Sequence, residues 1–180
     1  MSDVPEAPME DGPGGLAPAG EGWFVVNARD SRWVHHDELG SAVVFESHDH
    51  RFPHYGVNIQ VLQPGQPNCM YHGEEAQEDF LVLWGECLVL IEGEERRLRQ
   101  WDFVHCPSWT EHVFVGAGDG PCGILMIGAR TTGDGLLYPV NELARSHGAG
   151  VDVETPDGDV AYARFSPVVE GPYRGDLPEM

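Results

Sequence analysis

The chain has 180 residues, of which 30 are acidic and 10 are basic, so its formal net charge is -20. This length predicts one domain around a single hydrophobic core. The excess of negative charge opposes contact with phosphate backbones and with anionic membranes, so we expect neither a nucleic acid nor a membrane as a partner.

The sequence gives no signal for export or for membrane insertion. Its first residues lack the basic region and apolar core of a secretory signal. No apolar run approaches the ~18 residues that a membrane helix requires. The cysteines form no CxxC pair, which argues against a thiolate zinc site. We therefore expect a cytoplasmic protein with reduced thiols.

The chain divides by composition into three parts. Residues 1–22 are rich in Pro, Gly, Ala and acidic side chains, which predicts a disordered tail. Short apolar runs separated by turn residues then fill residues 23–140, and this spacing predicts an all-β sandwich or barrel. The strands that we expect cover residues 23–26, 42–45, 56–62, 80–83, 87–91, 96–99, 102–105, 112–115 and 123–127.

Residues 141–180 are expected to form a C-terminal extension that packs on the barrel and contains short helices. One helix is predicted at residues 141–147, closed by Gly148. Another is predicted at residues 157–163, with Thr155 as its N-cap and Pro156 at its first position.

One segment combines imidazole and carboxylate groups with an apolar strand. His72, Glu74 and Glu78 have the same parity as alternate residues of the strand 80–83, so in an extended chain they face the same side. His112 begins a second strand. An exposed acidic loop with an incidental histidine is the alternative, but carboxylates drawn inside a protein are costly unless they are paired or bind a metal. Nitrogen and oxygen ligands of this kind suit a divalent first-row metal.

Residues 56–129 resemble the cupin superfamily. The first cupin motif has a glycine, five residues, His-x-His, three or four residues, a glutamate, six residues and a glycine. The second motif contains Pro-x-Gly-x-x-His, followed four positions later by Asn. The residues that match these motifs, with one extra residue after the first glycine, are Gly65, His72, Glu78, Gly85, Pro107 and His112.

Four positions depart from the cupin pattern. Glu74 stands where the second histidine of the first motif is usual, and Gly116 replaces the asparagine of the second motif. Trp101 and Trp109 replace two glycines. Trp109, in the loop before the second-motif histidine, is the best candidate to shape a substrate pocket.

The resemblance implies a cupin-type jelly-roll β-barrel that binds a divalent metal, either Fe, Mn, Zn or Ni. By the resemblance, the metal ligands are His72, Glu78 and His112. Glu74 has three possible roles: a fourth ligand, a catalytic general base, or a side chain that points away from the metal.

The resemblance also implies action on a small organic molecule as an oxygenase or an isomerase. A non-catalytic module that binds a metal or a small molecule is the alternative, because the fold supports both. The apolar strand faces exceed what one small barrel buries, so we expect a homodimer. Further histidines at residues 48–54 lack a surrounding framework of carboxylates and strands, and we interpret them as an exposed loop.

Overall fold

The computed structural model describes residues 3–130 and 135–178, which are mostly β-strand. None of the helices in these two ranges is long and apolar enough to cross a membrane. The elements in chain order are β1 (Met9–Gly12), β2 (Gly15–Pro18), β3 (Arg32–His36), β4 (Gly40–Val44), β5 (Tyr55–Leu62), β6 (Gly73–Glu74), β7 (Glu78–Trp84), β8 (Glu86–Ile91), β9 (Glu94–Arg99), β10 (Phe103–Cys106), β11 (His112–Ala117), β12 (Cys122–Ala129), β13 (Leu136–Leu137), α1 (Glu142–Ser146), α2 (Gly158–Ala161) and β14 (Val169–Glu170).

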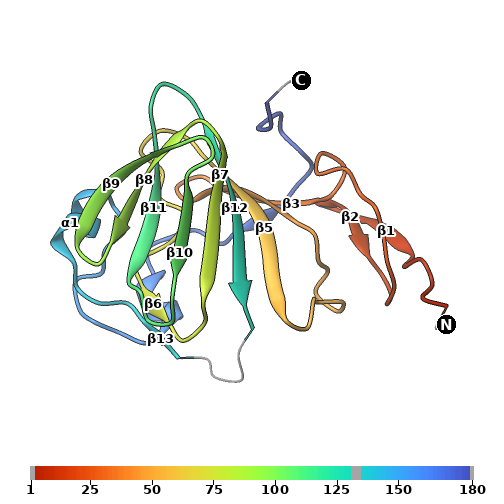
Figure 1. The fold of residues 1–180 in the computed structure, drawn as a ribbon, viewed down its shortest axis with the longest axis horizontal. Coiled ribbons are helices and arrows are strands. Elements are labelled where there is room, and N and C mark those ends of the chain that lie inside the picture. The colour runs from red at the N-terminus through yellow and green to blue at the C-terminus, as the bar shows by residue number, and fades with distance from the viewer. Residues whose placement is uncertain (1–2, 131–134, 179–180) are drawn as a thin grey trace.

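Two antiparallel sheets enclose the main core. The larger has seven strands in the order β10-β7-β12-β5-β4-β3-β14, and the smaller has the order β11-β8-β9 (Figure 1). The side chains between them are nearly all apolar: Leu62, Phe80, Val82, Cys87, Val89, Cys106, Phe114, Cys122 and Ile124. The predicted all-β fold is therefore confirmed, whereas a closed barrel stays a prediction, because the described strands belong to separate sheets.

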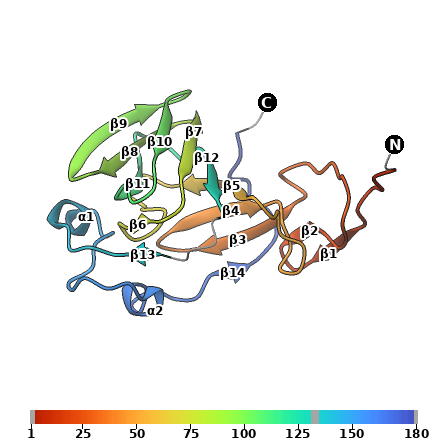
Figure 2. The same ribbon diagram turned by 60° about the horizontal axis from the view of Figure 1, so that its bottom comes forward.

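The N-terminal region differs from the disordered tail predicted for residues 1–22. Strands β1 and β2 form a hairpin (Figure 2). The Leu16 amide donates to the Asp30 carbonyl at 2.7 Å, and the Trp33 amide donates to the Gly14 carbonyl at 2.9 Å. Gly15 has a φ of +119°, and a Cβ there would lie 2.4 Å from the Ser31 carbonyl oxygen. Backbone hydrogen bonds and glycine contacts thus hold a segment that has little apolar surface to bury.

The C-terminal helices lie close to where the sequence predicted them. Helix α1 begins after Asn141, whose side chain accepts a hydrogen bond from the Ala144 amide at 3.0 Å. Helix α2 has Asp157 as its N-cap, so the prediction of Thr155 was wrong. The Thr155 hydroxyl instead accepts a hydrogen bond from the Asp157 amide at 3.1 Å, in the turn that precedes the helix.

Strand β3 was not predicted, because its sequence lacks a clear alternation of apolar and polar residues. Trp33 is fully buried, and the neighbouring His35 and His36 are buried as well. The two imidazoles are tolerated because their nitrogens have partners. For example, His35 Nδ1 lies 2.9 Å from Ser41 Oγ, and His36 Nε2 lies 2.8 Å from the Ser166 carbonyl oxygen. Residues 23–26, predicted as a strand, contain only an isolated bridge at Trp23.

An ion pair fixes the end of β12, which lies beside the first residue of β7. Both carboxylate oxygens of Glu46 accept hydrogen bonds from the Arg130 guanidinium, each at 2.8 Å. The Phe52 amide donates to the same carboxylate. Burial alone would raise the pKa of Glu46, but the guanidinium and this amide hold the pKa below its ordinary value.

Replacing Glu46 with Gln is expected to lower the free energy of unfolding by about 2 kcal/mol at neutral pH, the usual effect of losing hydrogen bonds to a charged group. Because the folded pKa of Glu46 lies below the unfolded one, its contribution is complete above the unfolded pKa. The contribution disappears as the pH falls through the folded pKa. Urea unfolding of both proteins over a pH series measures this difference.

Glu142→Gln is the matched control, since Glu142 also accepts from an arginine but its side chain is 80% exposed. The control is expected to change the free energy of unfolding by less than about 0.5 kcal/mol. If the Glu46→Gln protein loses as much free energy of unfolding in acid as it does at neutral pH, the ion pair is not the cause of the loss.

Candidate metal centre

The backbone brings His72 and His112 side by side. Residues 65–72 run antiparallel to β11, and the Asn68 amide donates to the Phe114 carbonyl at 2.9 Å. At the end of this pairing, the His112 amide donates to the His72 carbonyl at 2.8 Å, and the His72 amide donates to the His112 carbonyl at 3.2 Å. The two imidazole ring centres are consequently 5.2 Å apart.

Glu78 completes a group of three possible metal ligands. It is the first residue of β7, in the sheet opposite β11. One ligand atom from each of His72, Glu78 and His112 lies within 4.8 Å of the others. His112 Nε2 and Glu78 Oε2 are only 3.2 Å apart. The structure therefore places these three predicted ligands together.

Both histidines have the same orientation relative to their own backbone. His72 Nδ1 lies 2.8 Å from the Met70 carbonyl oxygen, and His112 Nδ1 lies 3.0 Å from the Thr110 carbonyl oxygen. Each Nδ1 thus donates to the carbonyl two residues earlier, which leaves each Nε2 directed at the site. Hydrogen bonds of this kind fix the tautomer and the ring orientation of metal-binding histidines.

The chemistry of this group fits a divalent metal. Glu78 Oε2 is buried and has no hydrogen-bond partner, despite its short distance to His112. A buried carboxylate oxygen without a donor is costly, and a bound cation would remove that cost. Two imidazole nitrogens and one carboxylate oxygen are ligands that iron, manganese, zinc and nickel all accept.

The two imidazoles differ in their affinity for a proton. Burial, together with the neighbouring His112, lowers the pKa of His72, which therefore stays neutral. Burial alone would also lower the pKa of His112, but Cys106 and the Glu78 carboxylate raise it to about 10. A cation entering the site must displace a proton from His112, because a metal binds the neutral imidazole.

Glu74 lies at the margin of the site. Its Oε2 is 3.9 Å from His72 Nε2, and its side chain is 29% exposed. The group of mutually close ligand atoms does not include Glu74. Burial and the nearby Glu78 raise the pKa of Glu74 to about 7. The carboxyl group can therefore gain or lose a proton near neutral pH.

Aromatic side chains form the walls around the histidines. The rings of Phe80 and Phe114 lie 5.1 and 6.1 Å from that of His112. The ring of Tyr138 lies 5.9 Å from that of His72. Tyr138 follows β13 and is held by an antiparallel bridge to Thr155. No local sequence signal predicted its contact with His72.

Cys69 also contacts the site. Its Sγ lies 3.7 Å from His72 Nδ1. Burial, followed by the charges of Glu78 and Glu74, raises the pKa of Cys69, so this side chain stays a neutral thiol.

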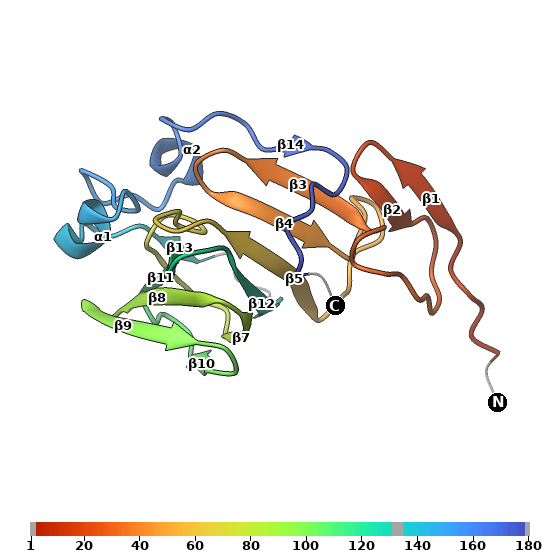
Figure 3. The same cartoon turned by 90° about the horizontal axis from the view of Figure 1, so that it is seen from above.

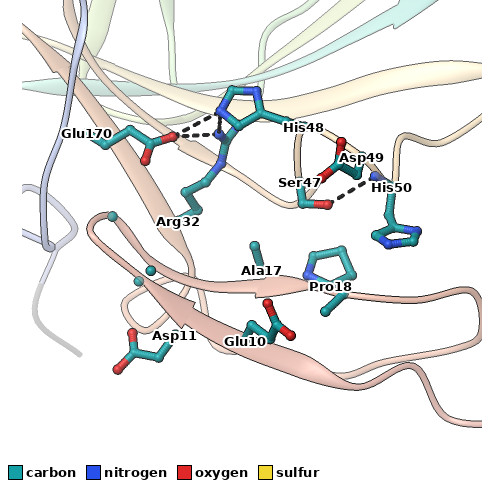
Figure 4. A pocket seen from close by; sticks show the side chains of 14 residues that line it. Glu10, Asp11, Ala17, Pro18, Arg32, Ser47, His48, Asp49, His50 and Glu170 are labelled. Carbon is teal, nitrogen blue, oxygen red and sulfur yellow. Dashed lines mark hydrogen bonds and ion pairs between the residues drawn. The ribbon is translucent and has the colours of Figure 1, made fainter.

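Two other regions that the sequence analysis considered are not part of the three-ligand group. Trp109 is 49% exposed, and its ring lies against Gly135. His48 belongs to a pocket near the N-terminal hairpin, where its Nε2 lies 3.0 Å from an Arg32 nitrogen and 3.3 Å from Glu170 Oε1 (Figure 4). Within residues 3–130 and 135–178, His48 and its neighbouring histidines are not part of a group with metal-ligand spacing.

Several solved structures are similar to part of this chain. The polyketide cyclase RemF from Streptomyces resistomycificus is 15% identical, with a TM-score of 0.52 over 59% of this chain and 79% of that one. A cupin protein from Bacteroides fragilis is 22% identical, with a TM-score of 0.47 over 61% of this chain and 85% of that one. The DMSP lyase DddQ from Ruegeria pomeroyi is 24% identical, with a TM-score of 0.41 over 47% of this chain, and the match spans only 43% of the lyase.

The family comparison agrees with the motifs. No curated protein matches this sequence. Residues 58–128, which include the three ligands and most of both main sheets, match the family model described as "Cupin domain". Residues 58–128 therefore match a cupin domain.

Proposed function

We propose that this protein is an enzyme that holds one divalent metal ion through His72, Glu78 and His112 and acts on a small organic molecule. The observation that carries the proposal is the buried Glu78 oxygen, which has no hydrogen-bond partner and faces two oriented imidazoles. The reaction classes that suit this site are oxygenation and isomerisation.

The ligand set favours an enzyme over a module with a structural metal. Three protein ligands leave coordination positions open, whereas a structural site is usually closed by four. A bound metal would supply Lewis acidity toward an oxygen atom of the substrate. The protein contributes the fixed direction of both Nε2 lone pairs and a wall of aromatic rings, which excludes water from one side of the site.

Glu74 is proposed as the general acid–base. It projects from β6 next to His72, outside the three-ligand group, and it is partly exposed. This position lets Oε2 take a proton from a substrate bound beside the histidines and return it to another atom of that substrate. Tyr138, whose ring lies 5.9 Å from that of His72, is proposed to limit the size of the molecule that fits.

Elemental analysis of protein purified without chelator tests the metal site. The wild type is expected to contain close to one divalent metal ion per chain, and the double variant His72→Ala, His112→Ala is expected to contain none. The buried histidines at positions 35 and 36 should not compensate, because backbone or hydroxyl groups occupy their nitrogens. Wild-type protein without stoichiometric metal, also after incubation with iron, manganese, zinc or nickel, would overturn the proposal.

A second experiment separates an open site from a closed one. Cobalt-loaded wild type is expected to change its visible absorption when azide is added, because an open position accepts the anion. Glu74→Gln is expected to keep the metal content and this response, since Glu74 is not a ligand in the proposal. Loss of metal from the Glu74→Gln protein would instead show that Glu74 is a ligand.

A further inference from the structure

The interior between the two main sheets becomes accessible to solvent toward one end of β5 and β12. Leu62 on β5 is fully buried in the core, and Asn58 and Gly56 lie on the same side of that strand but are only partly buried. On β12, Met126 and Gly128 are likewise inward-facing and partly buried. Figure 3 shows β5 between β4 and the strands β8 and β11 of the smaller sheet. A small molecule can therefore reach the inward side of β5 and β12 from this end.

Glycines form the floor of the interior beside the metal centre. Strand registers place Glu78 beside Gly128, and Gly128 beside Gly56, in one row across β7, β12 and β5. Neither glycine has a positive φ, so the backbone conformation does not require glycine at either position. A Cβ at Gly128 would lie 3.6 Å from Glu78 Oε1. The absent side chain thus leaves space directly beside a metal ligand.

Asn58 presents a polar atom without a partner to the next row inward. Its Oδ1 is buried and makes no hydrogen bond. The registers place Asn58 beside Met126, and Met126 beside Phe80. Turning the amide over would bring its Nδ2 to the same position, so one end of the amide lacks a partner in either orientation. Leaving such a group unpaired costs roughly 1–3 kcal/mol, and a bound hydroxyl group would remove that cost.

Asn68 adds a second carboxamide at the same place. Its Oδ1 accepts a hydrogen bond of 2.8 Å from the Phe114 amide, which fixes the orientation of the side chain. Its Nδ2 lies 3.9 Å from Met126 Sδ, and a thioether sulfur is only a weak acceptor. An unpaired acceptor on Asn58 and a weakly paired donor on Asn68 therefore both lie next to Met126. Hydroxyl groups, which donate and accept, suit both amides.

The charges around this space favour an uncharged ligand. Glu74 and Glu78 contribute carboxyl groups at the metal end. The cation beside Gly56 is Arg130, since a Cβ at position 56 would lie 3.4 Å from its Nη2. Both carboxylate oxygens of Glu46 already accept hydrogen bonds from this guanidinium, so its charge is neutralised. A phosphate group on the ligand would lie near carboxylates without a free cation to balance it.

We propose that Asn58 and Asn68 bind hydroxyl groups of an uncharged, polyhydroxylated substrate that lies over Gly128. The inference rests on the proposed function, because the metal at the three-ligand group holds the other end of the same molecule. Asn58 then determines specificity. A site built to hydrogen-bond a hydroxyl group discriminates strongly against analogues that lack it, since its own polar group is left unpaired.

Binding of two hydroxamates to cobalt-loaded protein, followed by visible absorption, tests the proposal. Acetohydroxamate carries only the metal-binding group, and D-gluconohydroxamate carries the same group on a polyhydroxyl chain. The wild type is expected to bind D-gluconohydroxamate about 10-fold or more tightly than acetohydroxamate, the effect of one or two hydrogen bonds. Asn58→Leu is expected to lose this difference and to keep its affinity for acetohydroxamate. A terminal phosphate on D-gluconohydroxamate is expected to weaken its binding to the wild type.

Stability separates recognition by Asn58 from a structural role. Asn58→Leu removes an unpaired buried atom, so its melting temperature is expected to equal or exceed that of the wild type. Val57→Thr is the matched control, because Val57 is the adjacent residue of β5 and faces the other side of the sheet. It is expected to leave both hydroxamate affinities unchanged.

Gly128→Ala provides a second variant. Its methyl group would meet Glu78 at ordinary contact distance, so the protein is expected to fold and to keep its cobalt and its affinity for acetohydroxamate. The methyl group occupies the floor, so the affinity for D-gluconohydroxamate is expected to fall about 10-fold or more.

Three outcomes would overturn the inference and leave the metal centre intact: equal affinity of the wild type for the two hydroxamates, an undiminished preference for D-gluconohydroxamate in Asn58→Leu, or tighter binding of the phosphorylated probe. A lower melting temperature of Asn58→Leu would assign Asn58 a structural role instead. A cobalt spectrum that neither hydroxamate changes would contradict the proposed function itself, and the inference would fall with it.

Discussion

Glu78→Gln is expected to weaken divalent metal binding by at least about 100-fold, the upper range found for residues that only support metal ligands. The amide is a weaker, uncharged ligand and does not neutralise the cation. The same substitution is expected to destabilise the metal-free protein, because the Glu78 carboxylate is one of the groups that raise the pKa of His112 to about 10 and so pairs with a charged imidazole. An amide at position 78 would leave this buried charge, 3.2 Å from Glu78 Oε2, without its anionic partner.

Two measurements on the same protein check this pair of outcomes. Competition with a chelator gives the metal affinity, and thermal unfolding in excess chelator gives the stability of the metal-free form. Glu75→Gln is the matched control, because Glu75 lies on the same segment but is exposed. The control is expected to change neither quantity. Unchanged metal affinity in the Glu78→Gln protein would show that Glu78 is not a ligand.

The three ligands were predicted from motif spacing, but parity along one strand is not what brings them together. Strand β6 ends at Glu74 and β7 begins at Glu78, so residues 72–78 are not one continuous strand. The antiparallel pairing of residues 65–72 with β11 places His72 opposite His112 instead. The spacing of the motifs predicted the ligands correctly because it fixes which residue of segment 65–72 pairs with His112.

Long-range contacts account for what the sequence analysis did not find. The aromatic wall includes Tyr138, which follows all the strands of the two main sheets except β14. The carbonyl groups of Met70 and Thr110, which orient the imidazoles, belong to residues whose side chains give no hint of this role. Backbone hydrogen bonds, which composition does not reveal, likewise order the hairpin of residues 9–18.

Gly116→Asn is expected to destabilise the protein by about 3 kcal/mol or more, although it restores the residue of the cupin pattern. A Cβ at position 116 would lie 2.2 Å from the Gln63 carbonyl oxygen, and backbone atoms cannot yield as a flexible side chain does. The amide of Gly116 donates to the Gln66 carbonyl at 2.9 Å, and its carbonyl accepts from the Gly65 amide at 2.8 Å. The substitution therefore forces residues 63–66 away from β11.

The same displacement is expected to reach the metal site, because residues 65–72 form one segment along β11 that ends at His72. Thermal unfolding should show a melting temperature lower by about 6–12 °C, given the usual 2–4 °C per kcal/mol for a chain of this size. Gly120→Asn is the matched control, since a Cβ there meets nothing within 4 Å and it is expected to change neither stability nor metal affinity. A Gly116→Asn protein with wild-type stability would show that the turn at residues 63–66 can move without cost. Reduced stability with wild-type metal affinity would show that the position of His72 does not depend on that turn.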